Sequence, residues 1–235
     1  MAATKAPEIS VDGRRFLRIP IRTHLLTSAD DLGAVCLEAA APHAEPGDVL
    51  FASHKAISIT QGRTRRASEV KPSRLARFLS RFVTRTPHGI GIGSPESMQC
   101  AIDDCGAGRI LLAAFVSALG KLVGRRGDFY RVAGPRAANI DAAGTSPVNP
   151  GLIVLAPLDP EGAAEELASR VGFPVVIVDA NDLGVSILGA SKGVDRDLIV
   201  RALSDNPLGQ GDQMTPIGLL RQAPNIANTE AATPV

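Results

Sequence analysis

Two aspartates that follow a short apolar run are the residues best placed to do chemistry. The run is Pro174 to Val178, and it leads directly to Asp179 and, three residues later, to Asp182. Carboxylates at the end of a buried strand are where α/β enzymes hold metal ions and phosphates. The alternative is structural: Asp and Asn are ordinary turn residues, so Asp179 would cap a turn and Asp182 would face water. Other segments must decide between these two interpretations.

A second segment with potential chemistry is the loop from Asn206 to Pro216, which is rich in glycine and small polar residues. Backbone amides at glycine can approach phosphate oxygens closely, so such a loop can hold a nucleotide. It could equally be a mobile surface connection. The stretch Pro87 to Pro95 is also glycine-rich, but its spacing fits neither of the two common phosphate-binding motifs.

Composition excludes several classes of partner. The 25 Lys and Arg residues are balanced by 24 Asp and Glu, so we expect neither nucleic acid nor a membrane as partner. Aromatic residues make up only 3%, which argues against a surface that stacks bases. The three cysteines are odd in number and lack CxxC spacing, so they predict neither a disulfide framework nor a zinc site. These features favour a cytoplasmic protein.

The chain is predicted to form a single domain over residues 15–221, with a flexible N-terminus (1–14) and a disordered tail (222–235). The first residues contain no apolar run of the kind that a secretion signal needs. The most apolar stretch, Ile110 to Val123, is shorter than the ~20 residues that span a bilayer. We therefore expect it to be a buried helix with Ala and Gly at close contacts.

The pattern of strands and helices expected around these residues predicts an α/β fold with mixed sheets and flanking helices. Strands are expected at Phe16 to Ile21, Asp48 to Ala52, Ala56 to Thr60, Phe129 to Ala133, Leu152 to Ala156, Val175 to Val178 and Ile217 to Leu220. Helices are expected from Asp30 to Ala39, from Ser73 as N-cap with Leu75, Phe78, Leu79 and Phe82 on one face, and at Ile110 to Val123, Glu161 to Val171 and Asp195 to Leu203. The segment from Arg136 to Pro150, which carries Asp141, is expected to be irregular.

Several short segments occur in an order that is itself informative. They are Ile19 to Ile21, Gly47 to Leu50, Ile57 and Ser58, Gly62 and Arg63, Val70 to Ser73, Asn139 to Asp141, Val178 and Asp179, and Leu208 to Thr215 running into Pro216 and Arg221. In this order the chain resembles, from about Phe16 to Arg221, the gamma-glutamyl ligases that act on the deazaflavin coenzyme F-420. It is similar to a divergent, shorter bacterial branch of that family.

The resemblance implies an amide ligase that depends on GTP and on Mg²⁺ or Mn²⁺, with the family's α/β fold and an intertwined homodimer. Its implied partners are small molecules, namely the deazaflavin precursor F-420-0, L-glutamate and GTP. In the chemistry that the family implies, a carboxylate of the deazaflavin tail attacks the gamma-phosphate of GTP. The amine of L-glutamate then displaces phosphate from the acyl phosphate.

The resemblance also implies roles for individual residues, although it assigns no catalytic residue. Asp141 and Asp179 match the metal-binding aspartates of the family, and hard carboxylate oxygens suit Mg²⁺ and Mn²⁺. One further family ligand is missing, and Asp182 or Asn181 is the candidate to replace it. The implied nucleotide-binding residues are Ile19, Pro20, Ile21, Arg22, His54, Lys55, Leu208, Gly209, Gln210, Gly211, Asp212, Gln213, Met214 and Thr215.

Three departures from the family pattern keep other functions open. Ile59 stands where the family has a nucleotide-contacting Lys, Gly144 stands where it has Asn, and Ala180 stands where it has a metal-binding Thr. The alternatives are a ligase for another small carboxylate, a non-catalytic nucleotide- or metal-binding relative, and a structural relative in which the aspartates are solvated turn residues.

Overall fold

The computed structural model describes residues 6–83, 91–125, 127–181, 184–209 and 212–224. The chain divides into two compact units. The first unit combines the residues up to Ile57 with those from Asp159 onward, and the second unit is the inserted stretch Ser58–Leu158. The single domain and the disordered ends expected from the sequence stay predictions.

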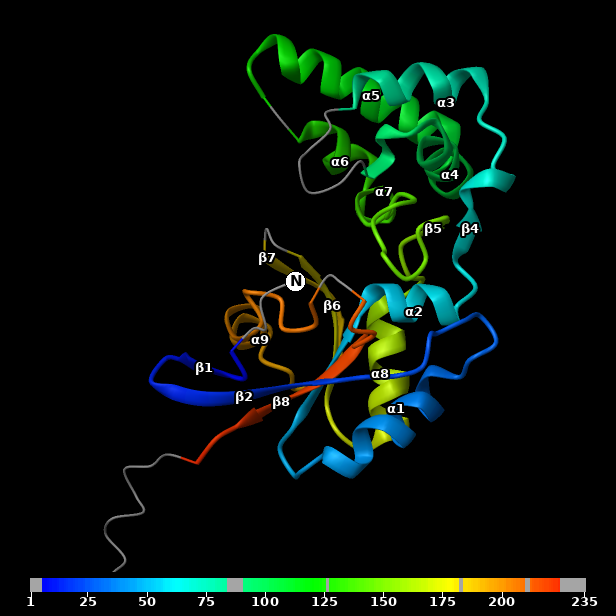
Figure 1. The fold of residues 1–235 in the computed structure, drawn as a ribbon. Helices are drawn as coiled ribbons and strands as arrows, with labels where there is room; N and C mark the ends of the chain where they lie inside the picture. Colours follow the sequence, from blue (N-terminus) through cyan, green and yellow to red (C-terminus); the bar gives the residue numbers. More distant parts are fainter. Residues whose placement is uncertain (1–5, 84–90, 126, 182–183, 210–211, 225–235) are drawn as a thin grey trace, which may run out of the picture. The chain divides into compact units, whose positions relative to one another are not determined.

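The first unit is built on one six-stranded sheet with the strand order β1-β2-β8-β3-β6-β7 (Figure 1). Its strands are β1 (Glu8–Val11), β2 (Arg14–Ile21), β3 (Val49–Ser53), β6 (Val175–Asn181), β7 (Gly184–Ala190) and β8 (Ile217–Gln222). β3 and β6 run parallel, and every other neighbouring pair is antiparallel. The mixed sheet with flanking helices agrees with the predicted α/β class.

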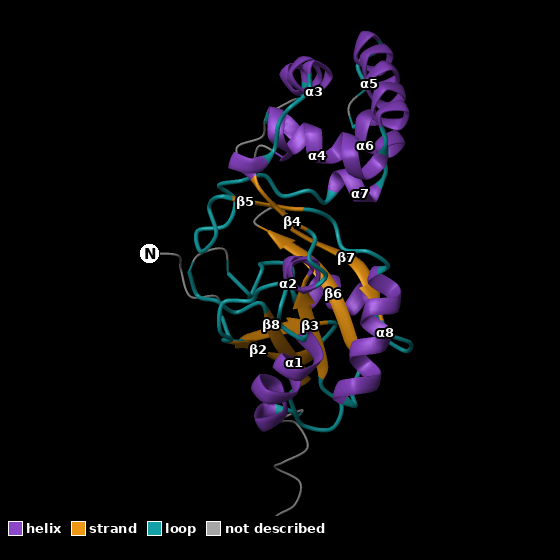
Figure 2. Cartoon of the chain, turned by 90° about the vertical axis from the view of Figure 1, so that its right-hand side faces the viewer, coloured by secondary structure: helices purple, strands orange, loops and turns teal. Residues whose placement is uncertain are grey.

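Helices cover both faces of this sheet because the central strands are apolar on both sides. Val175, Val176, Ile177 and Val178 of β6 are all fully buried, although successive residues of a strand point to opposite faces. On one face lies α9 (Arg196–Ala202), which contacts both edge strands, β1 and β7, so the sheet curls around it. On the other face α1 (Leu32–Ala40) and α8 (Pro160–Val171) lie side by side (Figure 2).

A carboxylate joins the two helices on that face. Asp31 is the N-cap of α1, where its side chain accepts hydrogen bonds from the amides of Gly33 and Ala34. Arg170 of α8 donates two further hydrogen bonds to the same carboxylate, each 2.6 Å long. The Arg170 guanidinium is the main reason that the pKa of Asp31 falls from 3.8 to about 2. The predicted helix start at Asp30 and Asp31 is therefore confirmed, with Asp31 as the cap.

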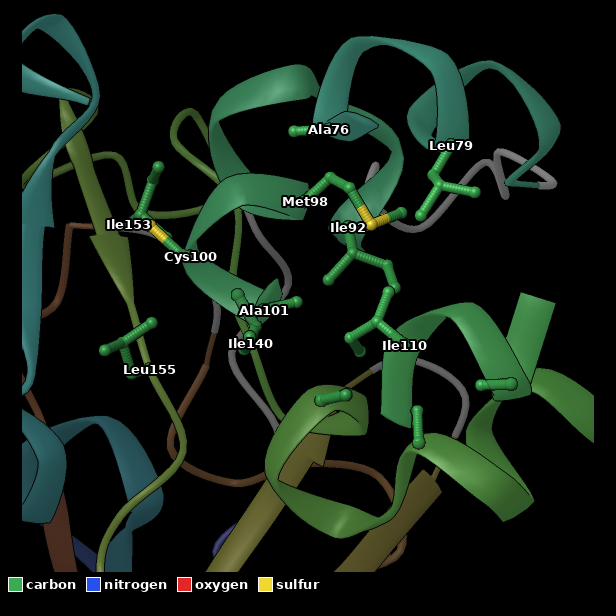
Figure 3. Close-up of a cluster of buried hydrophobic side chains, with 13 residues drawn as sticks. Ala76, Leu79, Ile92, Met98, Cys100, Ala101, Ile110, Ile140, Ile153 and Leu155 are labelled. Atoms are coloured by element: carbon green, nitrogen blue, oxygen red, sulfur yellow. The ribbon is translucent and has the colours of Figure 1, made fainter. Parts of the chain in front are cut away.

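The second unit is mainly helical. It contains α3 (Arg74–Leu79), α4 (Pro95–Cys105), α5 (Ala107–Leu122), α6 (Asp128–Ala133), α7 (Pro135–Ala138) and a small antiparallel sheet of β4 (Thr64–Arg66) and β5 (Leu152–Val154). The helix α2 (His54–Thr60) crosses the division between the units. Ile92, Met98, Ile110 and Ile153 are fully buried at the centre of the apolar core of this unit (Figure 3).

Two predicted strands are helices in the structure. Ala56 to Thr60 belongs to α2, in which the consecutive residues Ala56, Ile57 and Ser58 are all buried, whereas a half-buried strand would alternate. Phe129 to Ala133 belongs to α6, which is flanked by Gly127 and Gly134 at positive φ. An apolar run this short does not distinguish a strand from a helix, so the glycines at its ends decide.

The helix expected at Ile110 to Val123 is present as α5, but the expectation that it is buried is wrong. Only Ile110, Ala113 and Gly120 of its residues are buried, and Phe115 is 62% exposed. Within the described residues, no single helix is long and apolar enough to cross a bilayer. The pair α4 and α5 reaches that length and hydropathy only together, across a bend of 117°.

A close backbone approach in the first unit gives a test of the fold. A Cβ added at Gly189 of β7 would lie 2.1 Å from the carbonyl oxygen of Pro160, at the start of α8. Gly189→Ala must push helix and strand apart, and we expect it to lower the free energy of unfolding by about 2 kcal/mol or more in urea denaturation.

Gly108→Ala is the matched control, because Gly108 lies in α5 and a Cβ there meets nothing within 4 Å. It should be neutral or stabilise by about 0.5–1 kcal/mol. Equal effects of the two substitutions would contradict the packing of α8 on β7.

Candidate functional site

The ends of four strands of the six-stranded sheet meet at one edge. Ile21 of β2 pairs with Ile217 of β8, and Ile217 also pairs with Ala52 of β3. Ala52 in turn pairs with Ile177 of β6. The residues that follow this row in β2, β3 and β6 therefore share one edge with the segment that precedes β8. In open α/β sheets, ligands bind outside the carboxyl ends of the strands.

An imidazole and a carboxylate lie next to each other at this edge. His54 follows the last residue of β3 and begins α2, and Asp179 lies two residues beyond Ile177 in β6. Nε2 of His54 is 3.6 Å from Oδ1 of Asp179, and the two side chains are 2% and 30% exposed. The structure thus places one predicted metal ligand, Asp179, where it is accessible beside a buried histidine.

The loop predicted to hold the nucleotide is attached to the same edge. The hydroxyl of Thr215 donates a 2.6 Å hydrogen bond to the carbonyl oxygen of Leu208, which closes the loop on itself. The amide of Thr23, just beyond β2, donates to the carbonyl of Met214, and the amide of Ser53 donates to the carbonyl of Pro216. Gln210 and Gly211, also predicted to contact the nucleotide, lie outside the described residues.

A buried asparagine supports the base of this loop. Asn206 is 1% exposed, and its Nδ2 donates to the carbonyl of Gly209 at 3.3 Å. Its Oδ1 is buried and accepts no hydrogen bond from the described part of the chain. A buried acceptor without a donor is costly, which marks Asn206 as a group that a donor on a bound ligand or water would satisfy.

The predicted backbone contact segment Ile19 to Ile21 has an open side. β1 pairs with β2 only as far as Leu17, so in the described chain Ile19 to Ile21 pair with a strand on one side only, that of β8. The next residue, Arg22, is exposed, and Lys55 is partly exposed in the first turn of α2. Two cations at one sheet edge favour an anionic ligand such as a phosphate chain.

Two of the motif residues are structural. Asp48 is fully buried and accepts hydrogen bonds from Nε and one terminal nitrogen of Arg221, at 2.9 and 2.8 Å. This bidentate pair joins the residue just before β3 to β8. The hydrogen bonds that Arg221 donates to Asp48 are also the main cause that raises the pKa of Arg221.

Of the other two predicted metal ligands, the structure describes only Asp141. Asp141 belongs to the second unit, where its amide and carbonyl form a bridge to Val154 of β5 with distances of 2.8 and 3.0 Å. Asp182 lies outside the described residues, so its role stays a prediction.

Comparison with known families decides what kind of protein this architecture belongs to. Residues 20–182 match the sequence model of the family described as F420-0:gamma-glutamyl ligase. The chain belongs to this family. A search of curated proteins finds no significant match.

The family match includes His54, Lys55, Asp141 and Asp179, and it ends before the loop Leu208 to Thr215. The chain is therefore a relative of ligases, but the family match does not bear on the loop. The placement of this loop at the site is supported only by the hydrogen bonds that attach it to the ends of β2 and β3.

Divalent metal is implied by the family, and the first unit offers part of a site for it. Among the residues that the structure describes, no group of three His, Cys, Asp or Glu side chains could hold an ion alone. Asp179 is accessible with His54 beside it. This donor set fits Mg²⁺, which is commonly bound through one or two carboxylates and completed by water and substrate phosphates.

The proximity of His54 and Asp179 was not predicted, although the sequence contained a signal for it. Both residues follow short, fully apolar runs, Val49 to Ala52 and Val175 to Val178. Such runs are typical of neighbouring parallel strands, whose carboxyl ends meet at one edge. Assigning both runs to one sheet would have placed His54 next to Asp179.

The closure of the loop by Thr215 can be tested directly. Thr215→Val removes the donor to the Leu208 carbonyl, and we expect the free energy of unfolding to fall by about 1 kcal/mol and the loop to be cut faster by protease. Thr23→Val is the control, because among the described residues the Thr23 hydroxyl bonds only the carbonyl of the adjacent His24. It should change stability by less than about 0.5 kcal/mol. If both variants behave alike, the hydrogen bond does not hold the loop.

Proposed function

We propose that the chain is a GTP- and divalent-metal-dependent amide ligase that adds L-glutamate to the deazaflavin coenzyme precursor F-420-0. Family membership supports a ligase. The observation that carries the proposal is the sheet edge, where accessible Asp179 lies beside His54, and where Lys55 and the loop that precedes β8 are also located.

The reaction divides into two steps. A carboxylate oxygen of the acceptor attacks the gamma-phosphorus of GTP, the bond to the bridging oxygen breaks, and GDP leaves. The amine nitrogen then forms a bond to the acyl carbon and loses a proton, while inorganic phosphate leaves. A bound Mg²⁺ or Mn²⁺ would neutralise phosphate charge, which is the main contribution expected in phosphoryl transfer.

The residues of the chain itself would mainly bind and orient. Asp179 would hold the metal ion, with its carboxylate positioned by the buried His54. Lys55 and Arg22 would bind phosphate oxygens. The backbone of Leu208 to Thr215, fixed to the ends of β2 and β3, would surround the nucleotide. Asp141 as a second ligand is a prediction from the resemblance, and Asp182 as a third is a prediction from its position after Ala180, where the family has a metal-binding Thr.

The test is a phosphate-release assay with GTP, Mn²⁺, the deazaflavin acceptor and L-glutamate, followed by mass analysis of the amide product. Asp179→Asn should lower kcat/KM by on the order of 10²-fold, because one charge that stabilises the transition state is lost. Asp197→Asn, an exposed carboxylate in the first turn of α9, is the matched control and should keep full activity.

Because Ile59, Gly144 and Ala180 depart from the family pattern, the assay must distinguish the proposed ligase from two other nucleotide-dependent functions. Binding of GTP and Mn²⁺ without phosphate release from any acceptor would identify a non-catalytic relative. Release with a different small carboxylate would identify a related ligase. Absence of any calorimetric signal with Mn²⁺ and GTP would contradict all three nucleotide-dependent functions.

We also propose that the chain forms a homodimer through the exposed side of α5. Leu112, Phe115, Leu119 and Leu122, here called the α5 face, are all exposed and follow the 3-4-3 spacing of helices that pack on one another. With the exposed neighbours Leu111 and Val123, they offer on the order of 600 Å² of apolar surface, against about 800 Å² per partner in a standard interface.

Aromatic residues of the same unit extend this surface. The rings of Phe78 and Phe82 are exposed and lie 5.0 Å apart. Nζ of Lys121, near the end of α5, donates a 3.2 Å hydrogen bond to the carbonyl of Phe82, so α5 adjoins this pair. A connected apolar surface of this size is typical of an interface.

Light scattering after size-exclusion chromatography tests the dimer. The full chain should elute at twice its chain mass, and the double variant Phe115→Ser and Leu119→Ser should elute as a monomer with an unchanged circular dichroism spectrum. Leu37→Ser, at an exposed leucine of α1, is the control and should leave the dimer intact. A monomeric wild-type chain, or a dimer that survives the double variant, would contradict the proposed interface.

A further inference from the structure

A charged pocket lies within the second unit. It encloses about 450 Å³, within the range of about 300–1,000 Å³ that is common for small-molecule sites. Most of its lining belongs to β4, the segment that follows β4, and α4. Its lining residues are Arg63, Arg65, Arg66, Glu69, Val70, Lys71, Gln99, Cys100, Asp103, Asp104 and Leu155.

Some of the charged residues that line the pocket form ion pairs within the protein. Arg63 donates to Oδ1 of Asp104 at 2.7 Å and to the carbonyl of Ala156 at 2.6 Å. Arg136 of α7 donates to both oxygens of the same carboxylate, at 2.7 and 3.0 Å. Asp104 is therefore neutralised by two guanidinium groups, and neither Arg63 nor Asp104 is available to a ligand.

Arg66 and Glu69 form an exposed ion pair with each other at 3.7 Å, which leaves three other charged groups of the lining. In the described chain, Lys71 has no ion-pair partner, and the Arg65 guanidinium donates only to the carbonyl of Thr64. The carboxylate of Asp103 accepts a 2.7 Å hydrogen bond from the side-chain amide of Gln99 and has no cationic partner among the described residues. All three side chains are exposed to solvent. Two cations and one anion thus line the pocket without being paired to each other.

The floor of the pocket between these groups is uncharged. Cys100 and Leu155 are buried there, and Val70 is partly buried. Burial raises the pKa of the Cys100 thiol to about 11, so this group is neutral at physiological pH. A ligand that fits this arrangement has an aliphatic middle, two negative groups and one positive group.

We propose that this pocket binds an anionic α-amino acid such as L-glutamate, with its carboxylates at Arg65 and Lys71 and its ammonium group at Asp103. The pairing follows from charge and hydrogen-bond type, because ammonium donates to a carboxylate and both cations donate to carboxylates. That the bound amino acid is the amine donor of the ligase rests on the function proposed above, whereas the binding itself does not.

Isothermal titration calorimetry on the full chain, without nucleotide, tests the site. L-glutamate should bind with a Kd of about 1 mM or tighter, as for metabolite sites of exposed charge. Glutarate, which lacks the ammonium group, and L-glutamine, which lacks the second negative charge, should each bind at least about tenfold more weakly.

Substitutions of the three charged residues test which group of the ligand each residue binds. Lys71→Gln and Arg65→Gln should each weaken L-glutamate binding by about tenfold or more, and Asp103→Asn should weaken L-glutamate but leave glutarate unchanged. Arg74→Gln, an exposed arginine of α3 that does not line the pocket, is the matched control and should have no effect. Circular dichroism of each variant confirms that it is folded.

Several results would overturn the proposal. These are no heat with L-glutamate, binding that all three pocket variants leave unchanged, and binding of inorganic phosphate as tight as that of L-glutamate with no effect of Asp103→Asn. Failure of the ligase function gives a different result, namely glutamate binding that depends on these residues without amide formation. A working ligase whose KM for L-glutamate is unchanged in the pocket variants would contradict only the pocket.

Discussion

The insertion of β8 between β2 and β3 is the constraint on which the rest of the first unit depends. β2 and β3 do not touch each other in the sheet, and they are neighbours only through β8, which pairs with six residues of one and four of the other. Gly218 permits the close approach, because a Cβ there would lie 2.4 Å from the ring of Phe51. The buried pair of Asp48 and Arg221 fixes β8 along β3. The loop that precedes β8 and the ends of β2 and β3 can share an edge only because this strand is in place.

Motif residues in this chain therefore serve two different purposes. Asp48 and Arg221 hold strands together, and their neighbour in the sheet Arg18, which is 2% exposed, joins β2 to the end of α9 by binding Asp205 and the carbonyl of Ala202. Asp179 and Lys55 remain accessible at the edge. Burial separates the two groups, since a charge that is buried and paired inside the fold has no capacity left for a ligand. A sequence comparison alone gives both groups the same weight.

Four strands of the sheet, β2, β3, β6 and β8, and the helices on its α1 and α8 face could be predicted, because their apolar runs are short, bounded and distinct in period. The end of β6 at Asp179 followed from the run Val175 to Val178. What could not be predicted depends on tertiary contacts. The run Ala56 to Thr60 alternates like a strand, yet it continues from β3 as a helix with Ser53 accepting a hydrogen bond from the amide of Lys55. The apolar composition of α5 suggested a buried helix. Composition indicates that an apolar helix surface must be covered, but it does not show whether the same chain or another chain covers it. β7 begins at Gly184 and has Ser186 and Gly189 in its interior, and these residues weaken any strand pattern.

The position of β8 also decides when each part of the molecule can be completed during synthesis. The second unit is one continuous stretch, Ser58–Leu158, and all of its strands and helices exist once residue 158 has left the ribosome. β1, β2 and β3 are made earlier, yet β2 and β3 must wait for residues 217–222 before either gains its central neighbour. Chains are extended at about 5–20 residues per second, so unpaired strand edges persist for roughly ten seconds or longer. The earliest strands are thus the last to be closed, and the nascent chain is most exposed to aggregation at its N-terminal end.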